Sequence, residues 1–322
     1  MAKLKMHYLP RDFIETGDGL MFAVVDSQFE QGRVLGSLRY RRQDGRAVKL
    51  STAAANAWLE RHAPEVIFQS TRLAARLHGV PVDRIVRHYQ PRQRARELMT
   101  APKQDAIEAK ARHCLEILFD KGLPLEQVGI TGSLLIGAQH AASDLDFVIY
   151  DREAFQQARM IVREAIRSGD LDDLTPAAWR EAYARRGCEL SFEEYLWHER
   201  RKFNKGLYEG TKFDITLVSE SEDEPATACR KLGPIRLNAE VLDASHAYDF
   251  PARYRLAHAE IQEAISFSHT YAGQALAGEW ISIAGQLEAT RDGTRRIIVG
   301  STREAPDEFI KVLTDTPSAQ TP

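Results

Sequence analysis

Two short motifs in the middle of the chain have the residue types and spacing for phosphate and metal chemistry. Asp144 and Asp146 lie at the start of the otherwise apolar run 144–150, and Gly132-Ser133 precedes them in the chain. Residues two apart on a β-strand project from the same face, so the two carboxylates are expected to point together. Paired carboxylates repel each other unless a cation intervenes, and they suit Mg²⁺ or Mn²⁺. A glycine turn that opens a helix favours a bound anion.

The surrounding sequence predicts the elements that hold these motifs. The apolar residues 128–130 form a short strand before Gly132, and 144–150 form a second strand. A third strand is expected over 210–218, where Phe213 and Ile215 alternate with Asp214. Helical spacing over 107–118 and an N-cap at Asp151 add helices on either side. The pattern predicts an α/β domain with three carboxylates.

The stretch from Val128 to Phe147 resembles the signature of the DNA polymerase β superfamily of nucleotidyltransferases. The resemblance covers roughly residues 105 to 220. It implies a mixed β-sheet with helices, and two Mg²⁺ or Mn²⁺ ions bound with an NTP by Asp144, Asp146 and Asp214. It also implies that Asp214 acts as general base and that Gly132 and Ser133 cradle the phosphates. The alternative is an α/β domain in which these aspartates merely terminate strands.

Four cations at the end of the helix predicted over 192–204 are candidates to neutralise the triphosphate: Arg200, Arg201, Lys202 and Lys205. The alternative is that they complement the helix dipole, because cations in a last helical turn do so generally. His198 on the same helix is expected at the surface.

The densest basic stretch runs over 84–96 and contains five arginines: Arg84, Arg87, Arg92, Arg94 and Arg96. Such a stretch can track the phosphates of a nucleic acid, with its tyrosine as a stacking aromatic. It can equally be a charged linker between domains, which Pro91 favours. Both interpretations stay open.

Three domains are expected from the order of these patterns. Residues 1–102 are predicted as a β-meander plus helices at 53–61 and 71–77, and 103–224 as the catalytic domain. Residues 225–322 are predicted as a mostly β, small-barrel domain, OB-like in kind. Its aromatic residues suit either a base-stacking face or the core: Phe267, His269, Tyr271 and Trp280.

Composition narrows the function classes. The net charge of −3 gives no global sign of nucleic-acid binding, and no apolar run reaches a membrane-spanning length. Three scattered cysteines indicate reduced thiols and a cytoplasmic protein. We expect a metal-dependent nucleotidyltransferase that moves NMP from an NTP, such as ATP, to a hydroxyl, preferably a nucleic-acid 3′-end of RNA or DNA. Adenylylation of a protein or small molecule, or an inactive nucleic-acid-binding or scaffold protein, are the alternatives. The oligomeric state is left open.

Overall fold

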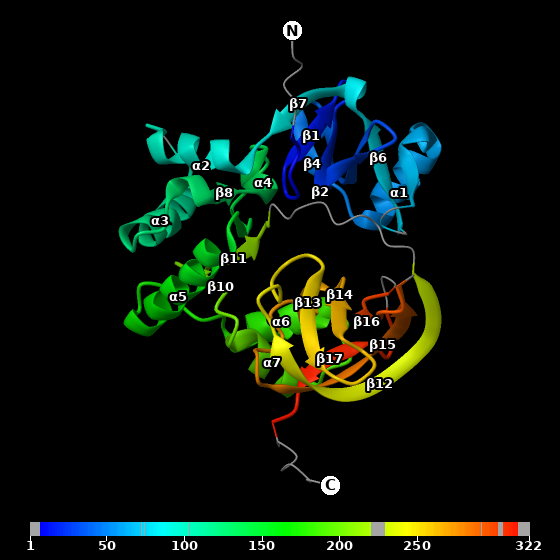
Figure 1. Ribbon diagram of the computed structural model, residues 1–322. Helices are drawn as coiled ribbons and strands as arrows, with labels where there is room; N and C mark the ends of the chain where they lie inside the picture. The colour runs from blue at the N-terminus through cyan, green and yellow to red at the C-terminus, as the bar shows by residue number, and fades with distance from the viewer. Residues whose placement is uncertain are drawn as a thin grey trace. The chain divides into compact units, whose positions relative to one another are not determined.

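The computed structural model describes residues 7–71, 73, 75–102, 104–219, 229–290, 292–301 and 305–314. The chain is mixed α/β and divides into two compact units (Figure 1). The first unit comprises Met1–Asp172 and Asn204–Ala226, and the second comprises Asp173–Phe203 and Thr227–Pro322. No helix among the described residues is long and apolar enough to cross a membrane.

The first unit begins with a seven-stranded sheet, which we call the N-terminal sheet. Its strand order is β5-β6-β3-β2-β1-β7, and β4 pairs with β3 beside β6. The strands are β1 Phe13–Thr16, β2 Leu20–Glu30, β3 Arg33–Gln43, β4 Arg46–Lys49, β5 Ile67–Ser70, β6 Ala75–Pro81 and β7 Ile85–Tyr89. The meander over β1 to β4 is confirmed, and its tight turns contain Gly19 and Gly45 at positive φ.

The N-terminal sheet buries both of its faces. On one face, Phe22 and Leu38 pack with Leu59 of helix α1 (Thr52–His62), which Ser51 caps. On the other face, Met21 and Tyr40 pack with Leu135 and Ile136, which lie far along the chain. This second contact joins the sheet to the segment that contains Gly132, so both belong to one unit.

The rest of the first unit is built on a four-stranded sheet, which we call the central sheet. Its order is β10-β11-β9-β8, with β11 parallel to β9 and the other pairs antiparallel. The strands are β8 Val128–Ile130, β9 Leu145–Ile149, β10 Lys205–Tyr208 and β11 Thr211–Leu217. The helices are α2 Pro91–Thr100, α3 Ala106–Asp120, α4 Gly132–Leu135 and α5 Arg152–Ser168. A buried apolar stripe on α5 covers the sheet, and Asp151 caps its start.

The second unit contains a closed five-stranded barrel. The pairings run β12-β13-β14-β16-β15 and return from β15 to β12, while β17 adds to β15 outside the ring. The strands are β12 Arg230–Asp243, β13 Ala252–Ala257, β14 Glu263–Ser266, β15 Trp280–Ala289, β16 Arg295–Val299 and β17 Phe309–Val312. Closure removes the free edges of the ring, and the small barrel expected near the C-terminus is confirmed in this form.

Helices α6 (Pro176–Arg186) and α7 (Phe192–Arg200) belong to the second unit, although the sequence assigns them to the range 103–224. The reason is their apolar faces. Trp179 of α6 and Tyr195 of α7 are buried in the same core cluster as Tyr254 and Ile283 of the barrel. The expected boundary near 102 also separates no units, because the N-terminal and central sheets share a core.

Three local predictions are wrong. The helix expected over 71–77 is wrong at residues 75–77, which belong to β6 and pair with β5, while 72 and 74 lie outside the described residues. Residues 84–96 are no linker: they form β7 and then α2, with Pro91 at the first helical position. His198 is buried, not on the surface, because its Nε2 accepts a hydrogen bond from the backbone N–H of Val312 in β17.

Candidate functional site

Asp146 and Asp214 occupy paired positions on the two parallel strands β9 and β11. Their apolar neighbours Leu145, Phe213 and Ile215 are buried on the opposite face of the central sheet. Partner residues on adjacent strands project from the same face, so the two carboxylates lie side by side. The alternation in two separate stretches of sequence has therefore brought two of the three predicted carboxylates together.

The charges of Asp214 and Asp144 both act on Asp146. The pKa of Asp146 is raised, first by burial and then by the carboxylates of Asp214 and Asp144, while Arg11 and Lys212 act to lower it. Lys212 Nζ lies 2.9 Å from Oδ2 of Asp214. Asp144 is exposed at the entry to β9. The cluster carries more negative charge than a half-buried site accommodates easily, and a bound cation would relieve it.

The turn between β8 and α4 lies against this cluster. The backbone N–H of Thr131 donates to the carbonyl oxygen of Asp146 at 2.9 Å, and Thr131 Oγ1 donates to the carbonyl oxygen of Arg11 at 2.7 Å. Gly132 follows with φ +67°, and a Cβ atom there would lie 2.3 Å from Oδ2 of Asp146. The position favours glycine, because it combines a left-handed backbone with close approach of the Asp146 carboxylate.

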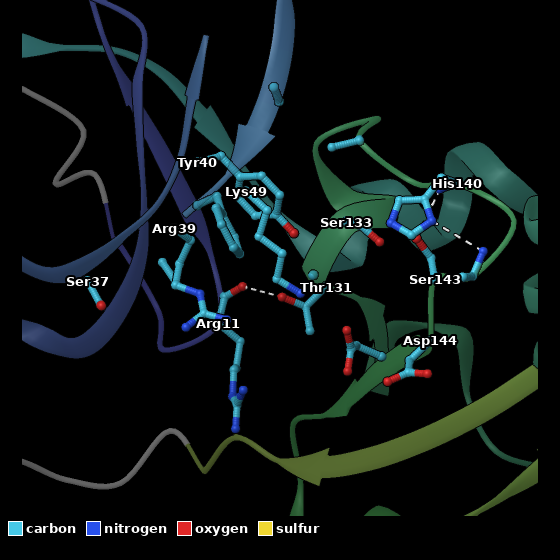
Figure 2. Close-up of a pocket in the computed structure, with 17 residues that line it drawn as sticks. Arg11, Ser37, Arg39, Tyr40, Lys49, Thr131, Ser133, His140, Ser143 and Asp144 are labelled. Carbon is cyan, nitrogen blue, oxygen red and sulfur yellow. Dashed lines mark hydrogen bonds between the residues drawn. The ribbon is translucent and has the colours of Figure 1, made fainter. Parts of the chain in front are cut away.

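A cavity of about 680 Å³ opens over the turn and two of the carboxylates. Figure 2 shows its two walls. One wall carries Thr131, Ser133 and Asp144, and the other carries side chains of the N-terminal sheet, including Arg39, Tyr40 and Lys49. The volume is in the range of about 300–1,000 Å³ that small-molecule sites occupy. The sequence motifs include residues of the first wall, but no residue of the second wall was expected at the site from the sequence.

A β-bulge shapes the second wall. Adjacent residues Met21 and Phe22 of β2 pair with Tyr40 and Leu38, which leaves Arg39 as an additional residue in β3. Leu38 therefore points to the α1 face of the sheet while Tyr40 points to the opposite face. Bulges re-aim side chains in this way and are frequent beside active sites. Here the bulge turns both Arg39 and Tyr40 toward the cavity.

The donor set fits Mg²⁺ or Mn²⁺. Three aspartates offer hard oxygen ligands, and the pKa of Asp146 is raised by burial and then by the neighbouring carboxylates, whose repulsion a cation would relieve. Within the described ranges, no three side chains of the metal-binding types converge into a complete cage. Mg²⁺ does not require one, because it usually binds through one or two carboxylates, waters and substrate phosphates.

The four cations expected at the nucleotide are separated by the fold. Lys205 lies on β10 at the position paired with Asp214, so it borders the carboxylates. The other three lie in the second unit, where each pairs with an acidic residue of that unit: Arg200 with Asp173, Arg201 with Glu279, and Lys202 with Glu199. Lys202 also donates to the carbonyl oxygen of Thr270 at 2.8 Å, and only 2% of its surface is exposed.

The arginines of the basic stretch 84–96 make contacts within the first unit. Arg84 pairs with Glu65 and Asp18, and Arg87 stacks over the ring of Tyr89. Arg92 donates to the carbonyl oxygen of Glu126, and Arg94 donates to that of Leu134. Arg96 is exposed on α2. These contacts give four of the five guanidinium groups a structural role, and the nucleic-acid role stays a prediction.

The aromatic residues singled out in the barrel divide between core and surface. Tyr271 is buried and donates to the carbonyl oxygen of Glu308. Phe267, His269 and Trp280 are exposed. The ring of His269 stacks on Phe250, with centroids 4.6 Å apart.

Comparison with known proteins gives a relative of nearly equal length. The chain is 32% identical over 335 aligned positions to "Uncharacterized protein MJ1086" of Methanocaldococcus jannaschii, and the match covers 94% of this chain and 98% of the archaeal protein. The chain belongs to the family of that protein. The name of the relative assigns it no activity. No family model and no solved structure matches the chain.

Proposed function

We propose that this family member is a metal-dependent nucleotidyltransferase that moves a nucleoside monophosphate from an NTP to a hydroxyl group. The observation that carries the proposal is the register of Asp146 and Asp214 on parallel strands, with Gly132 directly beneath Asp146. The resemblance of residues 128–147 to the polymerase β superfamily supports the same assignment and implies a nucleotidyltransferase fold for the central sheet.

The reaction exchanges one phosphorus–oxygen bond for another. The hydroxyl oxygen of the acceptor bonds to the α-phosphorus, the bond from that phosphorus to the α–β bridging oxygen breaks, and pyrophosphate leaves with the electron pair. Asp214 accepts the proton of the hydroxyl in this proposal. Backbone N–H groups after Gly132, together with Ser133, bind the phosphates. Asp144, Asp146 and Asp214 would hold two Mg²⁺ or Mn²⁺ ions, which when bound supply charge neutralisation at the phosphates and acidify the acceptor hydroxyl.

The acceptor class we favour is a nucleic-acid 3′-end, RNA or DNA, with the barrel as an OB-like acceptor-binding domain. Three exposed aromatic side chains of the barrel, Phe250, Phe267 and His269, support this choice because bases stack on such rings. The basic stretch 84–96 gives less support to a nucleic-acid acceptor, because Arg84, Arg87, Arg92 and Arg94 make internal contacts. A protein or small-molecule hydroxyl is the alternative acceptor.

The test is incubation of the protein with each α-³²P-labelled NTP and Mg²⁺ or Mn²⁺, against RNA, DNA, protein and small-molecule acceptors. We expect label to enter one acceptor class with release of pyrophosphate, and Asp144→Asn to stop the incorporation. If no NTP labels any acceptor under either metal, while the protein is folded by circular dichroism, the proposed function is wrong.

A further inference from the structure

The wall of the cavity that the N-terminal sheet supplies carries an unexplained positive charge. Arg39 on β3 and Lys49 on β4 both line the cavity. Throughout the ranges that the structure describes, no carboxylate lies within ion-pair distance of either side chain. Two other arginines of the same sheet are paired, Arg42 with Glu15 and Arg76 with Glu60. Arg39 and Lys49 are therefore available to bind a ligand that enters the cavity.

Placement of these cations depends on specific features of the sheet. The bulge brings Arg39 to the cavity side of β3, and the pairing of Tyr40 with Lys49 sets Lys49 beside it on the same side. Lysine on an edge strand is often there only to prevent aggregation, and β4 is an edge strand. That explanation does not cover Arg39, which lies within the sheet between β2 and β4.

The opposite wall identifies the charge of the ligand. It carries Asp144 and Asp146, which would hold the cations of a metal–phosphate complex. A ligand that reaches both walls must therefore be a polyanion with one end at the carboxylates. The cations expected on α7 are unavailable for this role, because Arg201 and Lys202 pair with Glu279 and Glu199 in the second unit.

We propose that Arg39 and Lys49 bind the β- and γ-phosphates of the nucleoside triphosphate, so that the N-terminal sheet completes the nucleotide site of the central sheet. This inference rests on the proposed function for the identity of the anion. Each cation forms a charge-assisted hydrogen bond to a phosphate oxygen, and Arg39 can do so with two parallel N–H groups. The charge that they neutralise stays on pyrophosphate as it leaves.

The experiment measures binding of inorganic tripolyphosphate by calorimetry, with EDTA and again with Mg²⁺, so that no turnover is needed. We expect Arg39→Gln and Lys49→Gln each to raise the Kd about tenfold, which corresponds to about 1.4 kcal/mol. Arg39→Lys and Lys49→Arg keep the charge and should recover most of the affinity. The matched control is Arg46→Gln, because Arg46 is exposed on β4, lies outside the cavity lining and should leave the Kd unchanged.

Two results would overturn the inference: an unchanged Kd in both glutamine variants, or no binding of tripolyphosphate by the wild type. Failure of the proposed function looks different. In that case the glutamine variants lose tripolyphosphate affinity as expected, but the wild type transfers no labelled nucleotide to any acceptor.

Discussion

The position that a Cβ atom would take on Gly132 lies 2.3 Å from Oδ2 of Asp146. The turn at Gly132 therefore packs directly against the Asp146 carboxylate. Because Thr131 also hydrogen-bonds to the backbone of Asp146 and of Arg11, the same turn links the central sheet to the N-terminal sheet.

The first prediction uses two glycines with the same backbone angle. Gly132 and Gly137 both have φ +67°, but a Cβ atom on Gly137 meets nothing within 4 Å. Both alanine variants should cost about 1–2 kcal/mol of stability from the left-handed backbone. Only Gly132→Ala should also displace Asp146 and lower kcat/KM for NTP, by about 100-fold. Equal kinetic losses in the two variants would show that the contact with Asp146 does not matter.

The second prediction concerns the repulsion at Asp146. Its pKa is raised in the folded protein, so its protonation favours folding: this stability is present below the unfolded pKa and is lost as pH rises through the folded pKa. In EDTA at neutral pH, Asp146→Asn should raise the Tm of the first unit by about 2–4 °C. The gain should shrink toward pH 4. A Tm that falls at neutral pH would mean that the carboxylate is stabilising there.

The third prediction concerns a buried neutral histidine. Burial lowers the pKa of His78 to about 4, and its ring accepts from the N–H of Leu38 and contacts Asn56. A lowered pKa means that the unfolded chain binds the extra proton first, so stability falls as pH drops from about 6.5 to about 4. The slope for one proton is about 1.4 kcal/mol per pH unit. His78→Gln should be less stable at pH 7 but should lose that slope in urea titrations across this range. An unchanged slope would place the proton uptake elsewhere.

The fourth prediction separates Lys202 from nucleotide binding. Its ammonium lies 2.5 Å from Oε1 of Glu199, and both side chains are almost fully buried. Removing one partner of a buried pair costs about 3–5 kcal/mol, so Lys202→Met should destabilise the protein by that amount. Lys202→Met with Glu199→Gln should recover part of the loss. The Kd for NTP, measured on folded protein, should not change. A large increase in that Kd would return Lys202 to the nucleotide site.

Local chemistry explains which parts of the fold were predictable. Asp151 caps α5 as expected, because capping depends on residues that are close in sequence. The alternation around Asp146 and Asp214 set the face of each strand, since that period is also local. The helix expected over 71–77 was wrong because residues 75–77 pair with β5, and strand pairing outweighed the local helical pattern.

The second wall of the site could not be predicted for a similar reason. Arg39 and Lys49 are ordinary cations on strands of a meander, remote in sequence from Asp144. Arg39 reaches the cavity through a one-residue bulge, whose position depends on how β2 and β3 pair. For Arg201 and Lys202, by contrast, closeness in sequence suggested a role at the site that was not found. They are close in sequence to β11, but α7 packs with the barrel.

The pairing of Asp146 and Asp214 as a catalytic site is tested by measuring pyrophosphate release and transfer of α-³²P label in wild type, Asp214→Asn and Asp170→Asn. Asp170 is an exposed aspartate just after α5 and serves as the matched control. We expect metal-dependent transfer by the wild type and Asp170→Asn, and a loss of about 100-fold or more in Asp214→Asn, because a ligand and proton acceptor is removed. Transfer by Asp214→Asn at the wild-type rate would contradict the pairing of Asp146 and Asp214 as the active site.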